Sequence, residues 1–261
     1  MKEFYTSALY MIDKENYRVN REELMIKFLD EFFWKCFFMI RMNCLEGDYL
    51  EFGCGSNIRS FRLAYKYNKL ENSGLRLFAF DSFEGLPDSK GIDKHPHWRK
   101  GAMAVSLEEF HQVMTSIGAA PGEYQVIPGF YDKTLHGFLP ADYGIKKAAI
   151  VFVDCDLYAS TVPVLKFVKD ILTDGSVIAF DDWFCFNGDP NKGEQKAFRE
   201  FLAQNEDIAV SEYLNFGWHG KSFIVHRPGH SVFDQWQAKS FPADRKNLFK
   251  RLLRYLYRLK P

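Results

Sequence analysis

Short apolar runs alternate with stretches of helical periodicity along most of the chain. The apolar runs predict five strands at Tyr49–Phe52, Leu75–Phe80, Tyr124–Pro128, Ala149–Val153 and Ser176–Phe180. Helical patterns lie between or after them at Ile58–Lys69, Ser106–Ile117, Ser160–Leu172 and Glu194–Gln204, and Gly175 marks the expected stop of the third. Strands that alternate with helices pair in parallel through right-handed crossovers. The pattern therefore predicts an α/β fold with a doubly wound, Rossmann-like, mostly parallel sheet.

The two ends of the pattern differ from its middle. Ala209–Phe216 and Lys221–His226 read as strands joined by a tight turn, which predicts an antiparallel edge on the parallel sheet. Near the N-terminus, Asn20 and Glu23 have capping-box spacing, which predicts a helix that begins at Asn20. We expect one domain, divided into an N-terminal helical extension (1–47), a core (48–228) and a basic helical tail (229–261).

Composition and charge narrow the class of protein. The chain has 261 residues, is 47% hydrophobic and 26% charged, and carries no formal net charge, so we expect a soluble protein without a nucleic-acid partner. Its five cysteines are scattered without a C-x-x-C motif, which indicates reduced thiols and a cytoplasmic location. No signal peptide is expected, and the apolar segment Phe32–Ile40 is too short to span a bilayer.

Acidic residues close four of the five predicted parallel strands. They are Glu51, Asp81, Asp154 and the pair Asp181-Asp182. In an open parallel sheet, ligands bind outside the carboxyl ends of the strands, so these acids are expected to meet at one edge. That edge is the predicted functional site.

The segment Tyr49–Asn57 (YLEFGCGSN) contains two glycines of a nucleotide-binding turn but not the third. Gly53 and Gly55 allow close approach of a ligand, whereas Ile58 occupies the position of the last glycine in G-x-G-x-x-G. This disfavours NAD. With Asp81 placed to accept hydrogen bonds from ribose hydroxyls, the turn favours an adenosine-type ligand without a pyrophosphate. The alternative is an ordinary tight strand-to-helix connection.

Three carboxylates are expected to converge after the last two parallel strands. Asp154, Asp181 and Asp182 would repel one another unless a cation lay among them, and an all-oxygen set suits Mg²⁺. The alternative is that some of these acids are helix caps or loop acids. Asp156 is interpreted in that way, as a cap of the following helix.

Four sequence motifs resemble those of the macrocin O-methyltransferase (TylF-like) family. They are LEFGCGS, LFAFDSFEGLP, VFVDCDLYAST and GSVIAFDDW, and GEQKAF at 193–198 also matches. The resemblance covers about residues 48–226. It implies a class I methyltransferase that uses S-adenosylmethionine and Mg²⁺ to methylate sugar hydroxyls.

The resemblance also implies roles for individual residues. The predicted cofactor contacts are Glu51, Gly53, Gly55 and Ser56 around the methionine part, Asp81 at the ribose, Ser82 and Phe83 near the adenosine, and Gly129 and Phe130 near the adenine. Asp154, Asp181 and Asp182 are the predicted metal ligands, and Asp154 is also the predicted general base. The chain departs from the family pattern at Ser56-Asn57.

These features predict a Mg²⁺-dependent O-methyltransferase that transfers a methyl group from S-adenosylmethionine to a sugar or glycan hydroxyl. The alternatives are methylation of a catechol-like or polyketide hydroxyl, and a catalytically silent binding module with the same fold. Three clustered acids argue against the silent module, which has little use for them.

Several segments outside the predicted edge carry further expectations. The insert Asp88–Met103 is expected to be a mobile lid, and its His95 and His97 are expected to be solvated rather than metal-bound. Trp183, Trp218 and His219 are interpreted as acceptor contacts or as core residues. The tail Arg245–Lys260 carries seven basic residues and no acids on an amphipathic pattern, which fits either a helix on an anionic membrane or one docked on protein. We also expect a homo-oligomer.

Overall fold

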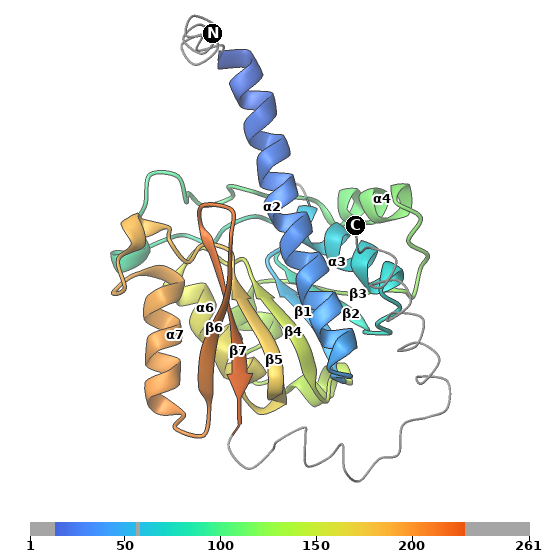
Figure 1. Ribbon diagram of the computed structural model, residues 1–261. Helices are drawn as coiled ribbons and strands as arrows, with labels where there is room; N and C mark the ends of the chain where they lie inside the picture. Colours follow the sequence, from blue (N-terminus) through green and yellow to red (C-terminus); the bar gives the residue numbers. More distant parts are fainter. Residues whose placement is uncertain (1–13, 56–57, 228–261) are drawn as a thin grey trace, which may run out of the picture.

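The computed structural model describes residues 14–55 and 58–227, and its centre is a seven-stranded sheet (Figure 1). The strand order is β3-β2-β1-β4-β5-β7-β6, and every neighbouring pair up to β5 is parallel. Strand β7 runs antiparallel to both of its neighbours. The strands are β1 (Asp48–Phe52), β2 (Leu77–Asp81), β3 (Gln125–Pro128), β4 (Ala148–Val153), β5 (Leu172–Phe180), β6 (Ala209–Phe216) and β7 (Gly220–His226).

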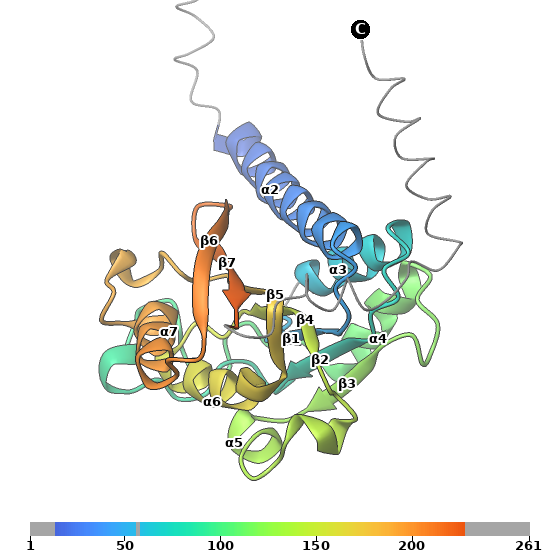
Figure 2. The same cartoon turned by 60° about the horizontal axis from the view of Figure 1, so that its bottom comes forward.

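Helices cover both faces of the sheet, in three layers (Figure 2). The α-helices are α2 (Lys14–Met42), α3 (Arg59–Leu70), α4 (Leu107–Ser116), α5 (Tyr131–Thr134), α6 (Tyr158–Val168) and α7 (Gly193–Gln204). Short 3₁₀ helices are η1 (Gly91–Asp93), η2 (Pro140–Tyr143), η3 (Lys169–Ile171) and η4 (Phe186–Gly188). Helices α2, α3 and α4 pack on one face, and α5, α6 and α7 pack on the other.

Each face of the sheet has its own hydrophobic core, because successive side chains of a strand point to opposite faces. In β1, Tyr49 belongs to the core under α2 and α3, whereas Leu50 and Phe52 belong to the core under α5 and α6. All six residues of β4 are buried, as expected of a central parallel strand covered on both sides. Because β1, β2, β4 and β5 pair in parallel, their carboxyl ends lie at the same edge of the sheet.

The predicted fold class is confirmed, and each predicted strand is present within a few residues of its expected bounds. The C-terminal strand pair forms an antiparallel hairpin at the sheet edge, with β7 inserted next to β5. All five cysteines are free thiols.

Two predicted helix boundaries are wrong. Helix α2 already spans Lys14–Met42, because no glycine or proline interrupts the residues before Asn20. Helix α6 ends at Val168 rather than Leu172, because Leu172 pairs with Ala148 and begins β5. Sheet pairing therefore overrides the helical pattern there.

Some predictions fall outside the described residues. They are the proposed cofactor contact at Ser56, its neighbour Asn57, and the basic tail with its membrane or docking role. Among residues 14–55 and 58–227, no helix combines the length and the apolar character needed to cross a membrane.

Candidate active site

The turn after β1 is shaped by its contact with β4. Gly53 has a φ of +87°, and a Cβ there would lie 1.8 Å from the carbonyl oxygen of Asp154. Only glycine therefore fits at this point, where the ends of β1 and β4 touch. Gly55 also has a positive φ, +56°, but a Cβ there would meet no atom of the described residues within 4 Å. This second glycine faces open space on the ligand side of the turn.

Asp81 ties the end of β2 to the same turn. Its carboxylate accepts hydrogen bonds from the backbone N–H of Cys54 at 2.7 Å and from the N–H of Phe83 at 2.6 Å. Burial raises the pKa of Asp81, and these backbone N–H groups oppose that rise. An ionised carboxylate offers about four acceptor sites, so capacity remains for hydroxyl groups of a ligand.

Glu51 lies beneath the turn and is fully buried. Its carboxylate accepts hydrogen bonds from the hydroxyl of Tyr49 and, at 2.7 Å, from the hydroxyl of Ser60 in α3. Burial raises the pKa of Glu51 to about 8, and the bonds from Tyr49 and Ser60 only partly oppose this. Glu51 therefore anchors α3 to β1 from inside the core.

A cavity of about 1520 Å³ opens at the shared strand edge. Six of the predicted site residues line it: Gly53, Gly55, Asp81, Ser82, Phe130 and Asp154. The wall formed by the described residues does not include Glu51, Phe83 or Gly129. The ring of Phe83 instead packs against Phe110, with ring centroids 5.6 Å apart. The ends of β1 and β2 and the loop after β4 therefore line one cavity.

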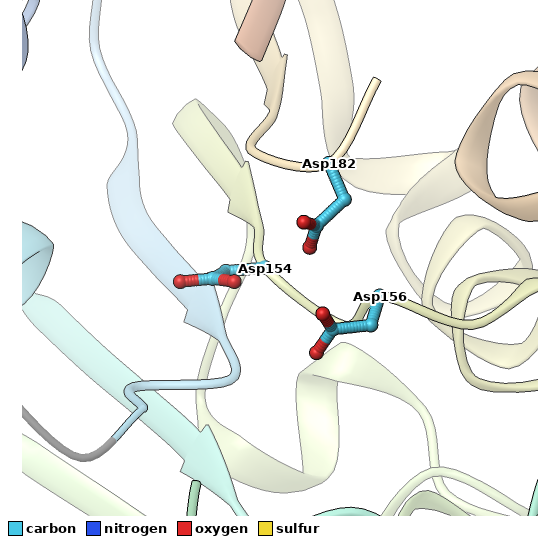
Figure 3. A group of neighbouring side chains, drawn as sticks. All are labelled: Asp154, Asp156 and Asp182. Atoms are coloured by element: carbon cyan, nitrogen blue, oxygen red, sulfur yellow. The ribbon is translucent and has the colours of Figure 1, made fainter. Parts of the chain in front are cut away.

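Three carboxylates converge beside this cavity (Figure 3). Asp154 follows β4, Asp156 lies two residues further on, and Asp182 follows β5; one oxygen of each lies within 4.8 Å of the others. Burial raises the pKa of Asp154, and the charges of Asp181 and Asp182 raise it further. Burial and the neighbouring acids likewise raise the pKa of Asp156. Three ionised groups this close repel strongly unless a cation lies between them.

The interpretation of Asp156 as a helix cap is wrong. Helix α6 has Leu157 at its N-cap position without a side-chain cap, and its first N–H groups bond instead to Asp93. Asp156 adopts a φ of +58°, which is unusual for a residue other than glycine and turns its buried side chain toward Asp154 and Asp182. The spacing Asp154-Cys-Asp156 in the sequence is the signal that could have placed Asp156 beside Asp154.

Asp181 is not in the group of three carboxylates. Its Oδ2 lies 3.6 Å from Nδ1 of His219, and burial raises its pKa to about 7 although His219 opposes the rise. His219 is buried in the hairpin between β6 and β7, whereas Trp218 is 68% exposed. Trp183 packs on the core under α7.

Several carboxylate oxygens near the group of three carboxylates are buried without a hydrogen-bond partner among the described residues. Among the described residues, Asp181 Oδ1, Asp182 Oδ2 and Glu194 Oε1 are buried and accept no hydrogen bond. Glu194, at the start of α7, is 1% exposed, and the sequence analysis did not select it. Such oxygens are costly to bury unless something binds them. Hard oxygen donors in this number fit Mg²⁺ or a similar divalent ion.

The segment between β2 and α4 covers the site. Leu86, Lys90, Lys100 and Met103 line the cavity from this side. Trp98 packs on Leu157, Cys185 and Phe186 in a small separate core. The ring of His95 packs against Trp98 in a tilted arrangement with centroids 3.8 Å apart, and His95 is not in the carboxylate group found among the described residues.

The strand order, the antiparallel β7 and the acid-bearing carboxyl edge define the class I methyltransferase fold. The chain belongs to the macrocin-O-methyltransferase (TylF) family, whose model matches residues 28–211. The family predicted from the motifs is therefore confirmed.

Individual relatives agree with this assignment. The chain is 28% identical over 145 residues to the 8-demethyl-8-(2,3-dimethoxy-alpha-L-rhamnosyl)-tetracenomycin-C 4'-O-methyltransferase of Streptomyces olivaceus, covering 53% of this chain and 54% of that protein. The match thus spans about half the length of this curated relative. The structure resembles the O-methyltransferase NovP (TM-score 0.61, 23% identity, 76% of this chain and 79% of that chain). It also resembles the calicheamicin methyltransferase CalS11 (TM-score 0.59, 22% identity, 75% and 77%). These two structural similarities, at 23% and 22% identity, show a shared fold and nothing beyond it.

Proposed function

We propose that the protein is an S-adenosylmethionine-dependent O-methyltransferase whose acceptor is a hydroxyl group of a sugar, and that it uses Mg²⁺. The observation that carries the proposal is the position of the half-buried Asp154 and the buried Asp156, whose carboxylates line the same cavity as Gly55 and Asp81. A methyl donor and a polar acceptor group can therefore meet in one space, as in-line transfer requires.

The methyl donor is proposed to lie between the ends of β1 and β2. Gly55 leaves room for the methionine part, and Asp81 provides acceptors for ribose hydroxyls. Phe130, which follows β3 and lines the cavity, is placed for the adenine. Glu51 supports this site from below by anchoring α3. The contacts predicted for Phe83 with the adenosine and for Gly129 with the adenine stay predictions.

The metal is proposed to be held by Asp154 and Asp182 together with a third carboxylate. Asp156 is the third member by distance, and Asp181, the ligand expected from the family resemblance, is adjacent and has a buried oxygen without a partner among the described residues. A divalent ion at this position would lower the pKa of a coordinated hydroxyl and fix its orientation.

Methyl transfer breaks the bond between the sulfonium sulfur and the methyl carbon and forms a bond from that carbon to the acceptor oxygen. The hydroxyl proton needs a nearby carboxylate as its acceptor. We assign this role to Asp154, which lines the cavity, and Asp156 is the alternative because it lines the cavity as well.

The choice of a sugar hydroxyl rests on the relatives. The Streptomyces olivaceus protein is named for methylation of a rhamnosyl group, and the family takes its name from macrocin. A catechol-like or polyketide hydroxyl was the alternative from the sequence, and no feature of the described residues favours it.

Isothermal titration of the protein with S-adenosylmethionine, with and without Mg²⁺, tests the proposal first. We expect binding in both conditions and methylation of rhamnosides only with the metal. Absence of heat both with and without Mg²⁺ would contradict the proposed cofactor.

A second experiment separates the two candidates for the third metal ligand by comparing the Mn²⁺ affinities of Asp156→Asn and Asp181→Asn. If a variant retains the wild-type affinity for Mn²⁺, the residue replaced in it is not a metal ligand.

A further inference from the structure

The segment Gly85–Met103, here called the cover segment, is closed at its base. The N–H of Leu86 donates to the carbonyl of Ala102 at 2.9 Å, and the N–H of Gly101 donates to the carbonyl of Leu86 at 2.9 Å. A Cβ on Gly85 would lie 2.5 Å from the oxygen of Ala102, so the two ends of the segment are in close contact. The cover segment is therefore a compact loop with its own internal hydrogen bonds.

Asp93, in η1 of the cover segment, binds the N-terminus of α6. Its carboxylate accepts the N–H of Tyr158 at 2.7 Å and the N–H of Ala159 at 3.0 Å, and the residue is only 3% exposed. The first N–H groups of a helix have no partner within the helix, and a carboxylate at this end is also stabilised by the helix dipole. A helix that follows the acid loop is thus capped from a segment 65 residues earlier in the chain.

Trp98 makes the second attachment of the cover segment. It is 6% exposed and packs on Leu157 and Phe186, with ring centroids of Trp98 and Phe186 4.5 Å apart. Both attachments therefore meet the short stretch between β4 and α6.

That stretch has little regular structure of its own to fix it. Asp156 has a φ of +58°, a conformation that persists in a non-glycine residue only where the surroundings enforce it. The end of β4 fixes the stretch on one side, and the start of α6 fixes it on the other. Asp93 holds the start of α6, so it controls the second of these two anchor points.

We propose that Asp93 is a positioning residue: by capping α6 from the cover segment, and together with Trp98, it holds Asp156 at the carboxylate cluster and the cover segment against the cavity. This inference rests on the proposed function for its consequence in catalysis. The same clamp places Leu86, Lys90 and Met103 in the cavity wall, so loss of Asp93 should weaken binding of both the metal and the acceptor. The methyl donor should be affected less, because Gly55 and Asp81 lie on other elements.

The test compares Asp93→Ala and Asp93→Asn with Ser106→Ala. Ser106 caps α4 through a capping box, so its variant loses a helix cap away from the carboxylates. The first readout is limited trypsin cleavage at the exposed Lys94, Arg99 and Lys100 of the cover segment. The second is Mn²⁺ affinity measured by electron paramagnetic resonance. We expect Asp93→Ala to accelerate cleavage and to weaken Mn²⁺ binding, each about tenfold, because two hydrogen bonds are lost.

Asp93→Asn keeps one acceptor oxygen and should give intermediate values, while Ser106→Ala should match the wild type in both. Trp98→Ala removes the packing of this ring on Leu157 and Phe186, so it should also accelerate cleavage and weaken Mn²⁺ binding. Equal cleavage rates for the wild type and both Asp93 variants would contradict the role of Asp93 in holding the cover segment. Faster cleavage with unchanged Mn²⁺ affinity would contradict its role in holding Asp156 at the carboxylate cluster. If the wild type binds no Mn²⁺, the proposed metal site is wrong. The positioning role of Asp93 is then tested without the metal, and an unchanged cleavage rate or an unchanged KM for the acceptor in Asp93→Asn would overturn it.

Discussion

Glu194 accepts a hydrogen bond from the backbone N–H of Asp182 at 2.9 Å, which joins the start of α7 to the turn after β5. Burial raises the pKa of Glu194, and the charges of Asp182 and Asp181 add to the rise. The carboxylate therefore holds the acid-bearing turn in place and also adds a buried oxygen near the proposed metal site. Its two functions can be separated by substitution.

Glu194→Ala should destabilise the protein by about 1–3 kcal/mol, because it leaves the N–H of Asp182 buried without an acceptor. Glu194→Gln keeps an acceptor oxygen and should destabilise it less, while still weakening Mn²⁺ binding through loss of charge. Urea unfolding and Mn²⁺ titration measure the two effects. The exposed Glu206→Ala on the following loop is the control and should change stability by less than about 0.5 kcal/mol. Equal stability of Glu194→Ala and wild type would contradict the proposed support of the turn.

The two glycines of the turn after β1 should respond differently to alanine. Gly53→Ala brings a Cβ to 1.8 Å from the oxygen of Asp154, so β1 and β4 must separate and the variant should unfold or lose well over about 3 kcal/mol. The Cβ of Gly55→Ala meets no atom in the part of the chain that the structure describes, so this variant should lose only about 1–2 kcal/mol for its left-handed conformation. Thermal unfolding of the two variants measures this contrast. Similar losses for both would show that the close approach to Asp154 is not the determining contact.

Asp81→Ala should weaken S-adenosylmethionine binding at least about tenfold, since it removes the proposed acceptors for the ribose and the bonds to Cys54 and Phe83. Mn²⁺ affinity should remain unchanged, because Asp81 is not in the carboxylate group. Calorimetric titration of each ligand provides the comparison. Glu84→Gln, on an exposed neighbouring side chain, serves as the control and should bind both ligands normally.

Stability without ligands should fall as the pH rises from about 4.5 to about 8, in part because of Glu51. The folded-state pKa of Glu51 is raised to about 8 from 4.5, so between these values the unfolded chain releases a proton that the folded chain retains. The slope from one such group approaches about 1.4 kcal/mol per pH unit. Asp181, with a pKa raised to about 7, contributes in the same direction.

Glu51→Gln should therefore flatten the stability profile between pH 5 and 8, as measured by urea unfolding across that range. Replacement of the exposed Glu46 by Gln should leave the profile unchanged. If Glu51→Gln and the wild type lose stability with the same slope against pH, the pKa of Glu51 is not raised in the folded protein, and the prediction is wrong.

The sequence alone determined the sheet and its functional edge. Short apolar runs located the strands, and acids at or directly after the ends of β1, β2, β4 and β5 located the site, because parallel strands bring their carboxyl ends together. The motifs around Gly53 and Asp182 further identified the family, which the family model confirms. These are local features, and a strand with its following residue can be read without knowledge of its neighbours.

Only the tertiary structure decided which acids meet and what holds them. Asp156 joins Asp154 and Asp182 because of a left-handed backbone angle, and Asp93 replaces it as the cap of α6 from a distant segment. The alternation of β1 directs Glu51 into the core beneath the turn, where its carboxylate binds Ser60 of α3. Contacts between residues far apart in the chain depend on packing, and no local pattern in the sequence specifies them.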